Sequence, residues 1–318
     1  RIRPTLVSPE DVKNGDLLKR GFTTLVLPYS KGMSTGEADA ILAFVKQGGL
    51  VIADNQPATY SEHGRELETG RLGAIFPELD KTHLMSYGKG HGAYIPGQIN
   101  GYLGRVESCD YTGADTVAAL LKEYAGITSI LQITDDAGVE RRDTFMPAFE
   151  LGSTRLVGLM RMYTSKDKES DESQIRFERK YHVWDVRQHE YLGHVDALSM
   201  TLDLHPRFLA LLPANLGAVR IASESPTVKQ ASDCVIKGTV AFADAAASEE
   251  LAQVVQIRVY DPDGKECEYY RKNILFKGQT FRYEFPVSYT EAPDRYTVVA
   301  EHAITGHKAQ THFDVIAE

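Results

Sequence analysis

Cysteine, tryptophan and long apolar runs are all scarce in this sequence of 318 residues, and each shortage excludes a class of protein. The three cysteines, Cys109, Cys234 and Cys267, lie far apart and form no C-x-x-C motif, which argues against a disulfide scaffold or a cysteine-rich zinc site. No apolar run approaches the roughly 20 residues that a membrane helix needs. We therefore expect no bound metal ion, no other cofactor and no membrane partner.

Positive charge is scarce relative to negative charge. The sequence has 35 lysine and arginine residues against 44 aspartate and glutamate residues, and its formal net charge is -9. Nucleic acids and anionic membranes attract basic proteins, so neither is expected as a partner. The hydrophobic fraction of 42% and the charged fraction of 25% are typical of a soluble globular protein. The compartment stays open between the cytoplasm, the periplasm and the outside of the cell.

The stretch from Gly21 to Asn55 has the clearest pattern in the chain. Thr23–Leu27 is a short apolar run that predicts a buried strand. Ser34 and Glu37 form the S-x-x-E of a capping box, and the helical spacing of apolar residues after it ends at Gly48-Gly49. A second apolar run follows at once. Strand, capped helix and strand in so few residues predict a βαβ unit with parallel strands.

The pattern changes along the rest of the chain. Ala114–Tyr124 predicts the closing helix of the first domain, and from Thr128 the sequence reads as successive short strands separated by turn signals. A linker is expected near Pro226, after which strands alternate with the period of two. Asp294–Val298 resembles the penultimate strand of an immunoglobulin-like sandwich.

The first domain carries a family resemblance. Leu27-Pro28, Ser34, Phe44-Val45 and Gly48-Gly49, followed by the glycine-rich Gly88–Tyr94, resemble the glutamine-amidotransferase-like domain of β-galactosidase-type glycoside hydrolases, also called the β-galactosidase trimerisation domain. The resemblance covers roughly residues 5–125. It implies a flavodoxin-like α/β fold that packs beside a separate catalytic barrel and helps to form oligomers. No barrel is present in this sequence, and no Gly-x-Cys-x-Gly of a true amidotransferase occurs in it.

Pattern and resemblance together predict a multidomain protein of α/β plus all-β class. The predicted parts are a flavodoxin-like, class I glutamine-amidotransferase-like α/β domain at 1–126, a β-rich domain at 127–225 and an immunoglobulin-like β-sandwich at 226–318. A doubly wound domain normally has a strand and a helix before the point where this chain begins. We therefore expect the α/β domain to lack its first strand and the chain to be part of a longer protein.

Two places in the sequence carry candidate ligand-binding residues. Glu62, His63 and Arg65 lie in the loop after the second predicted strand, where an acid, a base and a cation together could bind a sugar or a carboxylate. Trp184 could stack on a sugar ring, although a tryptophan on a strand is more often part of a core. The histidines of the predicted β-rich domain lie at spacings that fit no metal-binding template. No catalytic residue is assigned, because the many carboxylates give no means of selecting a pair.

Three functions remain open from the sequence. The first is a non-catalytic accessory or oligomerisation portion of a carbohydrate-active, β-galactosidase-like protein, whose partners are other domains of a longer chain or other subunits. The second is a glycan-binding module that uses the β domains. The third is a stand-alone hydrolase that uses the loop from Asp54 to Arg65. Since an incomplete α/β sheet would leave an unpaired edge, we expect that edge to meet another domain or subunit.

Overall fold

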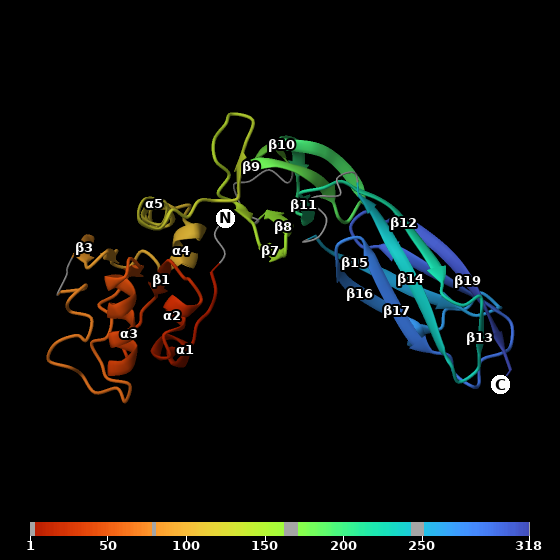
Figure 1. The fold of residues 1–318 in the computed structure, drawn as a ribbon. Coiled ribbons are helices and arrows are strands. Elements are labelled where there is room, and N and C mark those ends of the chain that lie inside the picture. The colour runs from red at the N-terminus through yellow and green to blue at the C-terminus, as the bar shows by residue number, and fades with distance from the viewer. Residues whose placement is uncertain (1–3, 78–80, 162–170, 243–250, 318) are drawn as a thin grey trace. The chain divides into compact units, whose positions relative to one another are not determined.

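The computed structural model describes residues 4–77, 81–161, 171–242 and 251–317. Strands hold 46% of the described residues and helices 15%, so this part of the chain is mainly β-structure. Its internal contacts divide the chain into an N-terminal unit, Ile2–Ile130, and a C-terminal unit, Leu131–Glu318 (Figure 1). No helix within the described ranges is long and apolar enough to cross a membrane.

The N-terminal unit contains one small mixed sheet. Its strands follow the order β1-β2-β4-β3. The pairs β1/β2 and β2/β4 are parallel, whereas β3/β4 is an antiparallel hairpin. The strand bounds are β1 Thr24–Leu27, β2 Leu50–Ala53, β3 His83–Tyr87 and β4 Gly90–Tyr94.

Helices cover both faces of this sheet. On one face, Ile41, Phe44 and Val45 of α3 are buried in a core with apolar side chains of β1 and β2. On the other face, Leu121 of α5 belongs to a second core with side chains of β2 and β4. The helix bounds are α1 Pro9–Lys13, α2 Asp16–Lys19, α3 Thr35–Lys46, α4 Tyr102–Glu107 and α5 Thr112–Ala125.

The prediction of a parallel β1-α3-β2 unit is confirmed, but the prediction of a flavodoxin-like, glutamine-amidotransferase-like α/β domain is wrong. A doubly wound sheet needs a helix between each pair of parallel strands. Between β2 and β4 the described chain instead forms irregular turns and then the antiparallel strand β3. The segment from Leu67 to Phe76 forms no regular helix, because Gly70 and Gly73 lie within it and Pro77 follows it.

The C-terminal unit begins with a seven-stranded sheet. Its main path is β10-β9-β11-β8-β6, with β5 on β9 and β7 on β8, and every pairing is antiparallel. The bounds are β5 Leu131–Thr134, β6 Thr144–Phe145, β7 Ala148–Leu151, β8 Thr154–Arg161, β9 Asp171–Asp185, β10 Glu190–Leu202 and β11 Arg207–Leu212.

Two further sheets, β12-β14-β17 and β13-β19-β18-β15-β16, enclose one apolar core. Trp184, Ala210 and Leu212 of the seven-stranded sheet belong to the same core, so this sheet packs against the two others through these side chains. The division into three domains stays a prediction. The bounds are β12 Leu216–Ser223, β13 Thr227–Lys229, β14 Asp233–Phe242, β15 Ala252–Tyr260, β16 Lys272–Lys277, β17 Thr280–Pro286, β18 Arg295–His302 and β19 Lys308–Ile316.

Candidate functional site

The carboxyl ends of the parallel strands are held together by Asp54. Its side chain is 3% exposed and lies directly after β2. The Tyr29 N–H donates to Asp54 Oδ1 at 3.0 Å, and the Asn100 N–H donates to Asp54 Oδ2. Tyr29 has a φ of 50°, a left-handed conformation that this hydrogen bond helps to hold. Asp54 therefore fastens the loops after β1 and β4, using its oxygens as acceptors for backbone groups.

The structure places Glu62, His63 and Arg65 in an exposed turn. The N–H groups of His63 and Arg65 donate to Ser61 Oγ at 3.3 and 3.1 Å. The backbone N–H groups of His63 and Arg65 thus help to define the turn. Their role as ligand-binding residues stays a prediction.

The Glu62 carboxylate has a cation partner that the sequence did not reveal. Arg71 Nη1 lies 2.8 Å from Glu62 Oε2, and this hydrogen bond is the largest cause that lowers the pKa of Glu62. Arg71 also donates to the Met33 carbonyl oxygen. The contact depends on the course of the loop between the two residues, for which neither strand nor helix periodicity provides a signal.

Trp184 is part of the core of the C-terminal unit. Its ring is 5% exposed, and it lies 5.2 Å from the Tyr191 ring and 6.1 Å from the His307 ring. The Trp184 Nε1 donor is buried, with no hydrogen-bond partner among the described residues. Sugar stacking by Trp184 stays a prediction, and it would require the packing around the indole to open.

The histidine-rich part of β9 and β10 brings two rings together. His182 and His194 are cross-strand neighbours whose rings stack at 4.2 Å, and Tyr191 Oη lies 2.7 Å from His182 Nδ1. Within the described ranges, no group of three or more histidine, cysteine, aspartate or glutamate side chains could hold a metal ion.

The three cysteines are free thiols in different surroundings. Cys109 is exposed, whereas Cys234 and Cys267 are buried. Burial raises the pKa of the Cys234 thiol to about 11 and also raises that of Cys267. The two buried thiols are therefore poor nucleophiles at neutral pH.

An open groove runs along β1, at the edge of the N-terminal sheet. It has a volume of about 770 Å³ and is lined by the extended segment 4–7, by β1 and the loop after it, and by Leu121 and Ile127. Most of its lining is apolar, and three of its side chains are well exposed: Leu6 at 95%, Val26 at 40% and Tyr29 at 53%. This groove is the candidate interaction surface of the unit.

The backbone of β1 offers unused hydrogen-bonding groups to this groove. The Leu50 N–H donates to the Thr23 carbonyl oxygen at 3.0 Å, which fixes the alternation of the strand. Since successive residues of a strand direct their N–H and C=O groups to opposite sides, those of Thr24 and Val26 point away from β2. Among the described residues no strand pairs with this side of β1.

No protein-family model and no curated protein matches the sequence. Among solved structures, the chain is similar to Gan42B, a GH42 β-galactosidase from G. stearothermophilus, with 14% identity, a TM-score of 0.46, and coverage of 66% of this chain and 34% of that one. It is also similar to a β-galactosidase from Bacillus circulans sp. alkalophilus, with 12% identity, a TM-score of 0.44, and coverage of 60% and 33%. The chain thus spans about a third of the length of these enzymes.

Proposed function

We propose that this chain is a non-catalytic accessory portion of a β-galactosidase-like, carbohydrate-active protein, and that its N-terminal unit serves assembly. The observation that carries the proposal is the open edge of β1 beside an apolar groove of about 770 Å³. An exposed edge strand is a template for pairing with another chain or domain, and proteins usually cover it. We assign the edge of β1 as the contact through which the unit joins a second strand.

The chemistry of the edge fits an added strand. A partner strand would satisfy the outward N–H and C=O groups of Thr24 and Val26, and its side chains would cover Val26 and fill the groove. Pairing through backbone groups supplies affinity, and alternate side chains supply specificity. In a contact between two copies related by a two-fold axis, β1 of one copy would pair antiparallel with β1 of the other.

Residues that resemble the β-galactosidase trimerisation domain shape α3 and its junction with β2, the strand that pairs with β1. Ser34 caps α3, accepting from the Glu37 N–H at 3.2 Å. A Cβ atom on Gly49 would lie 2.3 Å from the Phe44 ring, so the close approach of α3 to the start of β2 requires glycine. The motif thereby positions α3, whose apolar side chains pack in one core with those of β1 and β2. This supports an assembly role of the trimerisation type.

Sedimentation equilibrium of the 35.3 kDa chain tests the assembly contact. We expect reversible self-association that the variant Val26→Pro abolishes, because proline removes the outward N–H donor without touching the bonds to β2. Val26→Thr, which keeps the N–H and a β-branched shape, serves as the matched control and should associate like the wild type. Far-UV circular dichroism establishes that both variants fold. A monodisperse wild-type monomer with a rapidly exchanging Val26 amide would contradict the proposal.

The non-catalytic assignment has its own assay. We expect the purified chain to give no hydrolysis of a nitrophenyl β-galactoside above the rate in buffer. If the chain does hydrolyse this substrate and the variant His63→Ala loses the activity, the stand-alone hydrolase that uses the loop from Asp54 to Arg65 is the better account. Ser225→Ala, in the exposed segment after β12, provides a control variant for the same measurement.

A further inference from the structure

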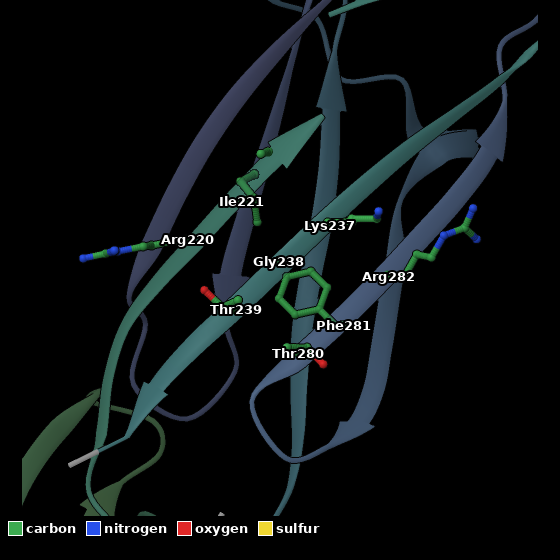
Figure 2. Close-up of a pocket in the computed structure, with 9 residues that line it drawn as sticks. Arg220, Ile221, Lys237, Gly238, Thr239, Thr280, Phe281 and Arg282 are labelled. Carbon is green, nitrogen blue, oxygen red and sulfur yellow. The ribbon is translucent and has the colours of Figure 1, made fainter. Parts of the chain in front are cut away.

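The outer face of the sheet β12-β14-β17 carries a hollow of about 600 Å³ (Figure 2). The strand register places Arg220 opposite Thr239 and Thr239 opposite Thr280. In a second row, Lys237 lies opposite one residue of β12 and one residue of β17. Because directly opposite residues in antiparallel strands share a face, both rows project to the same side of the sheet. This side is the solvent-exposed one.

Positive side chains form the two sides of the hollow. In the view of Figure 2, the side chain of Arg220 extends toward the β12 edge of the sheet, whereas those of Lys237 and Arg282 extend toward the β17 edge. Lys237 and Thr239 lie on the central strand β14 between the two arginines, and Thr280 of β17 lies opposite Thr239. The three cations span two strand spacings, about 10 Å. The arrangement is a shallow trough with cations on both flanks and hydroxyl groups in its floor.

The charges on this face remain available to a ligand. Lys237 pairs with Glu224 at 2.8 Å, and Arg282 contacts Glu284, but all four side chains are exposed. Exposed ion pairs contribute little to stability, so an anionic ligand can displace these carboxylates at small cost. Arg220 forms no ion pair within the described part of the chain. The trough therefore presents one free guanidinium and two cations that can exchange partners.

The trough favours a ligand recognised by charge rather than by stacking. Phe281 is the aromatic residue of the trough, and it is 5% exposed, with its ring on the core side of Gly238. Neutral sugars and nucleic-acid bases commonly stack on exposed aromatic faces, which the outward side chains here do not provide. Guanidinium groups instead match carboxylate and sulfate geometry.

We propose that the outer face of β12, β14 and β17 binds an acidic oligosaccharide. Its anionic groups are met by Arg220 and Arg282 on the two flanks and by Lys237 between them, while the hydroxyl groups of Thr239 and Thr280 bond to the sugar hydroxyls. The choice of a carbohydrate rests on the proposed function. The choice of an acidic one rests on the three cations.

Titration calorimetry with an oligogalacturonide and with a sulfated galactan oligosaccharide tests this site, using a neutral galactan oligosaccharide of the same length for comparison. We expect saturable binding of an acidic probe that weakens as salt is added. The double variant Arg220→Ala, Arg282→Ala should bind about tenfold more weakly or worse. Lys229→Ala removes one exposed positive charge from β13 of the other sheet and should bind like the wild type.

Three results would overturn the proposal. The first is the absence of binding to both acidic probes. The second is an equal loss of affinity in Lys229→Ala and in the double variant, which would indicate non-specific attraction. The third is equally tight binding of polyglutamate, which would identify a surface for acidic peptides. The assembly contact is tested independently, because Val26→Pro lies in the other unit and should leave oligosaccharide binding unchanged.

Discussion

His302 is a neutral histidine enclosed in the core of the C-terminal unit. It has no exposed surface, and its Nδ1 atom accepts from the Ile304 N–H at 3.3 Å and from the Thr305 N–H at 3.2 Å. Its Nε2 lies 3.1 Å from Gln253 Oε1, where only a protonated Nε2 completes the bond. Burial lowers the pKa of His302 to about 4, and the charges of His307 and His189 act in the same direction. The fold therefore requires the neutral ring.

This requirement predicts a loss of stability in acid. An unfolded histidine takes up its proton near pH 6.5, whereas folded His302 does so only near pH 4. The stabilising contribution of neutral His302 should therefore be fully present above about pH 6.5. Between there and pH 4 the free energy of unfolding should fall by about 3 kcal/mol, and below pH 4 it should level off. Urea denaturation followed by Trp184 fluorescence, at a series of pH values, measures this decline.

Two variants separate His302 from the other titrating groups. His302→Asn keeps an acceptor near the Nδ1 position but cannot be protonated, so its stability should vary less with pH in this window. His205→Asn changes an exposed histidine beside Asp203 and should keep the wild-type decline. If both variants keep the decline, another group causes it.

Among the elements, the junction of α3 and β2 depends on one glycine. The Phe44 ring occupies the space that a side chain on Gly49 would need, with 2.3 Å between its nearest atom and a Cβ there. Gly49→Ala should destabilise the N-terminal unit by about 1–3 kcal/mol, since Phe44 must leave its rotamer or the helix must shift. Faster hydrogen exchange of the β2 amides would report the loss.

A matched glycine in the same unit provides the control. Gly104 lies in α4, and a Cβ atom there would meet nothing within 4 Å. Gly104→Ala should leave the β2 amides unchanged or slightly better protected, because alanine favours the helix. Equal exchange rates of the β2 amides in the two variants would show that the Phe44 contact does not determine the stability of the unit.

The elements also show where sequence patterns suffice. The capping box at Ser34, the helix after it and the parallel strands were predictable, because the signals for each lie within a few residues of one another. The glycine-rich segment Gly88–Tyr94 begins with a turn and continues as β4. A Cβ atom on Gly90 would lie 2.2 Å from the Gly49 carbonyl oxygen, so glycine is needed there for close packing. That reason depends on a distant segment and leaves no local signal.

The same difference between local signals and contacts with distant segments applies to the candidate sites. The loop of Glu62, His63 and Arg65 could be located from its place after a strand, but its partner Arg71 could not. The trough that Arg220, Lys237 and Arg282 flank exists only when the register of three strands is known. Each of these cations, viewed in the sequence alone, is an ordinary exposed charge on a strand.

At the scale of the whole molecule, side chains of more than one sheet form the apolar core of the C-terminal unit. Thr154 Oγ1 donates to the Ala252 carbonyl oxygen at 2.7 Å, and His189 Nδ1 lies 3.0 Å from the Ile304 carbonyl oxygen. These two links join the seven-stranded sheet and its β9–β10 turn to the strands after it, as the core around Trp184 also does. The expected linker near Pro226 could not reveal this continuity, because composition reports local turns rather than long-range packing.

The positions of the exposed thiol and of the tryptophan allow energy transfer to be measured in the native chain. Cys109 is the exposed thiol and lies in the N-terminal unit, while Trp184, the single tryptophan, is fixed in the interior of the C-terminal unit. A maleimide dye that absorbs at the emission wavelength of tryptophan would therefore attach to one unit and accept energy from a donor in the other. The efficiency of this transfer would follow the separation of the two units in solution without any engineered residue.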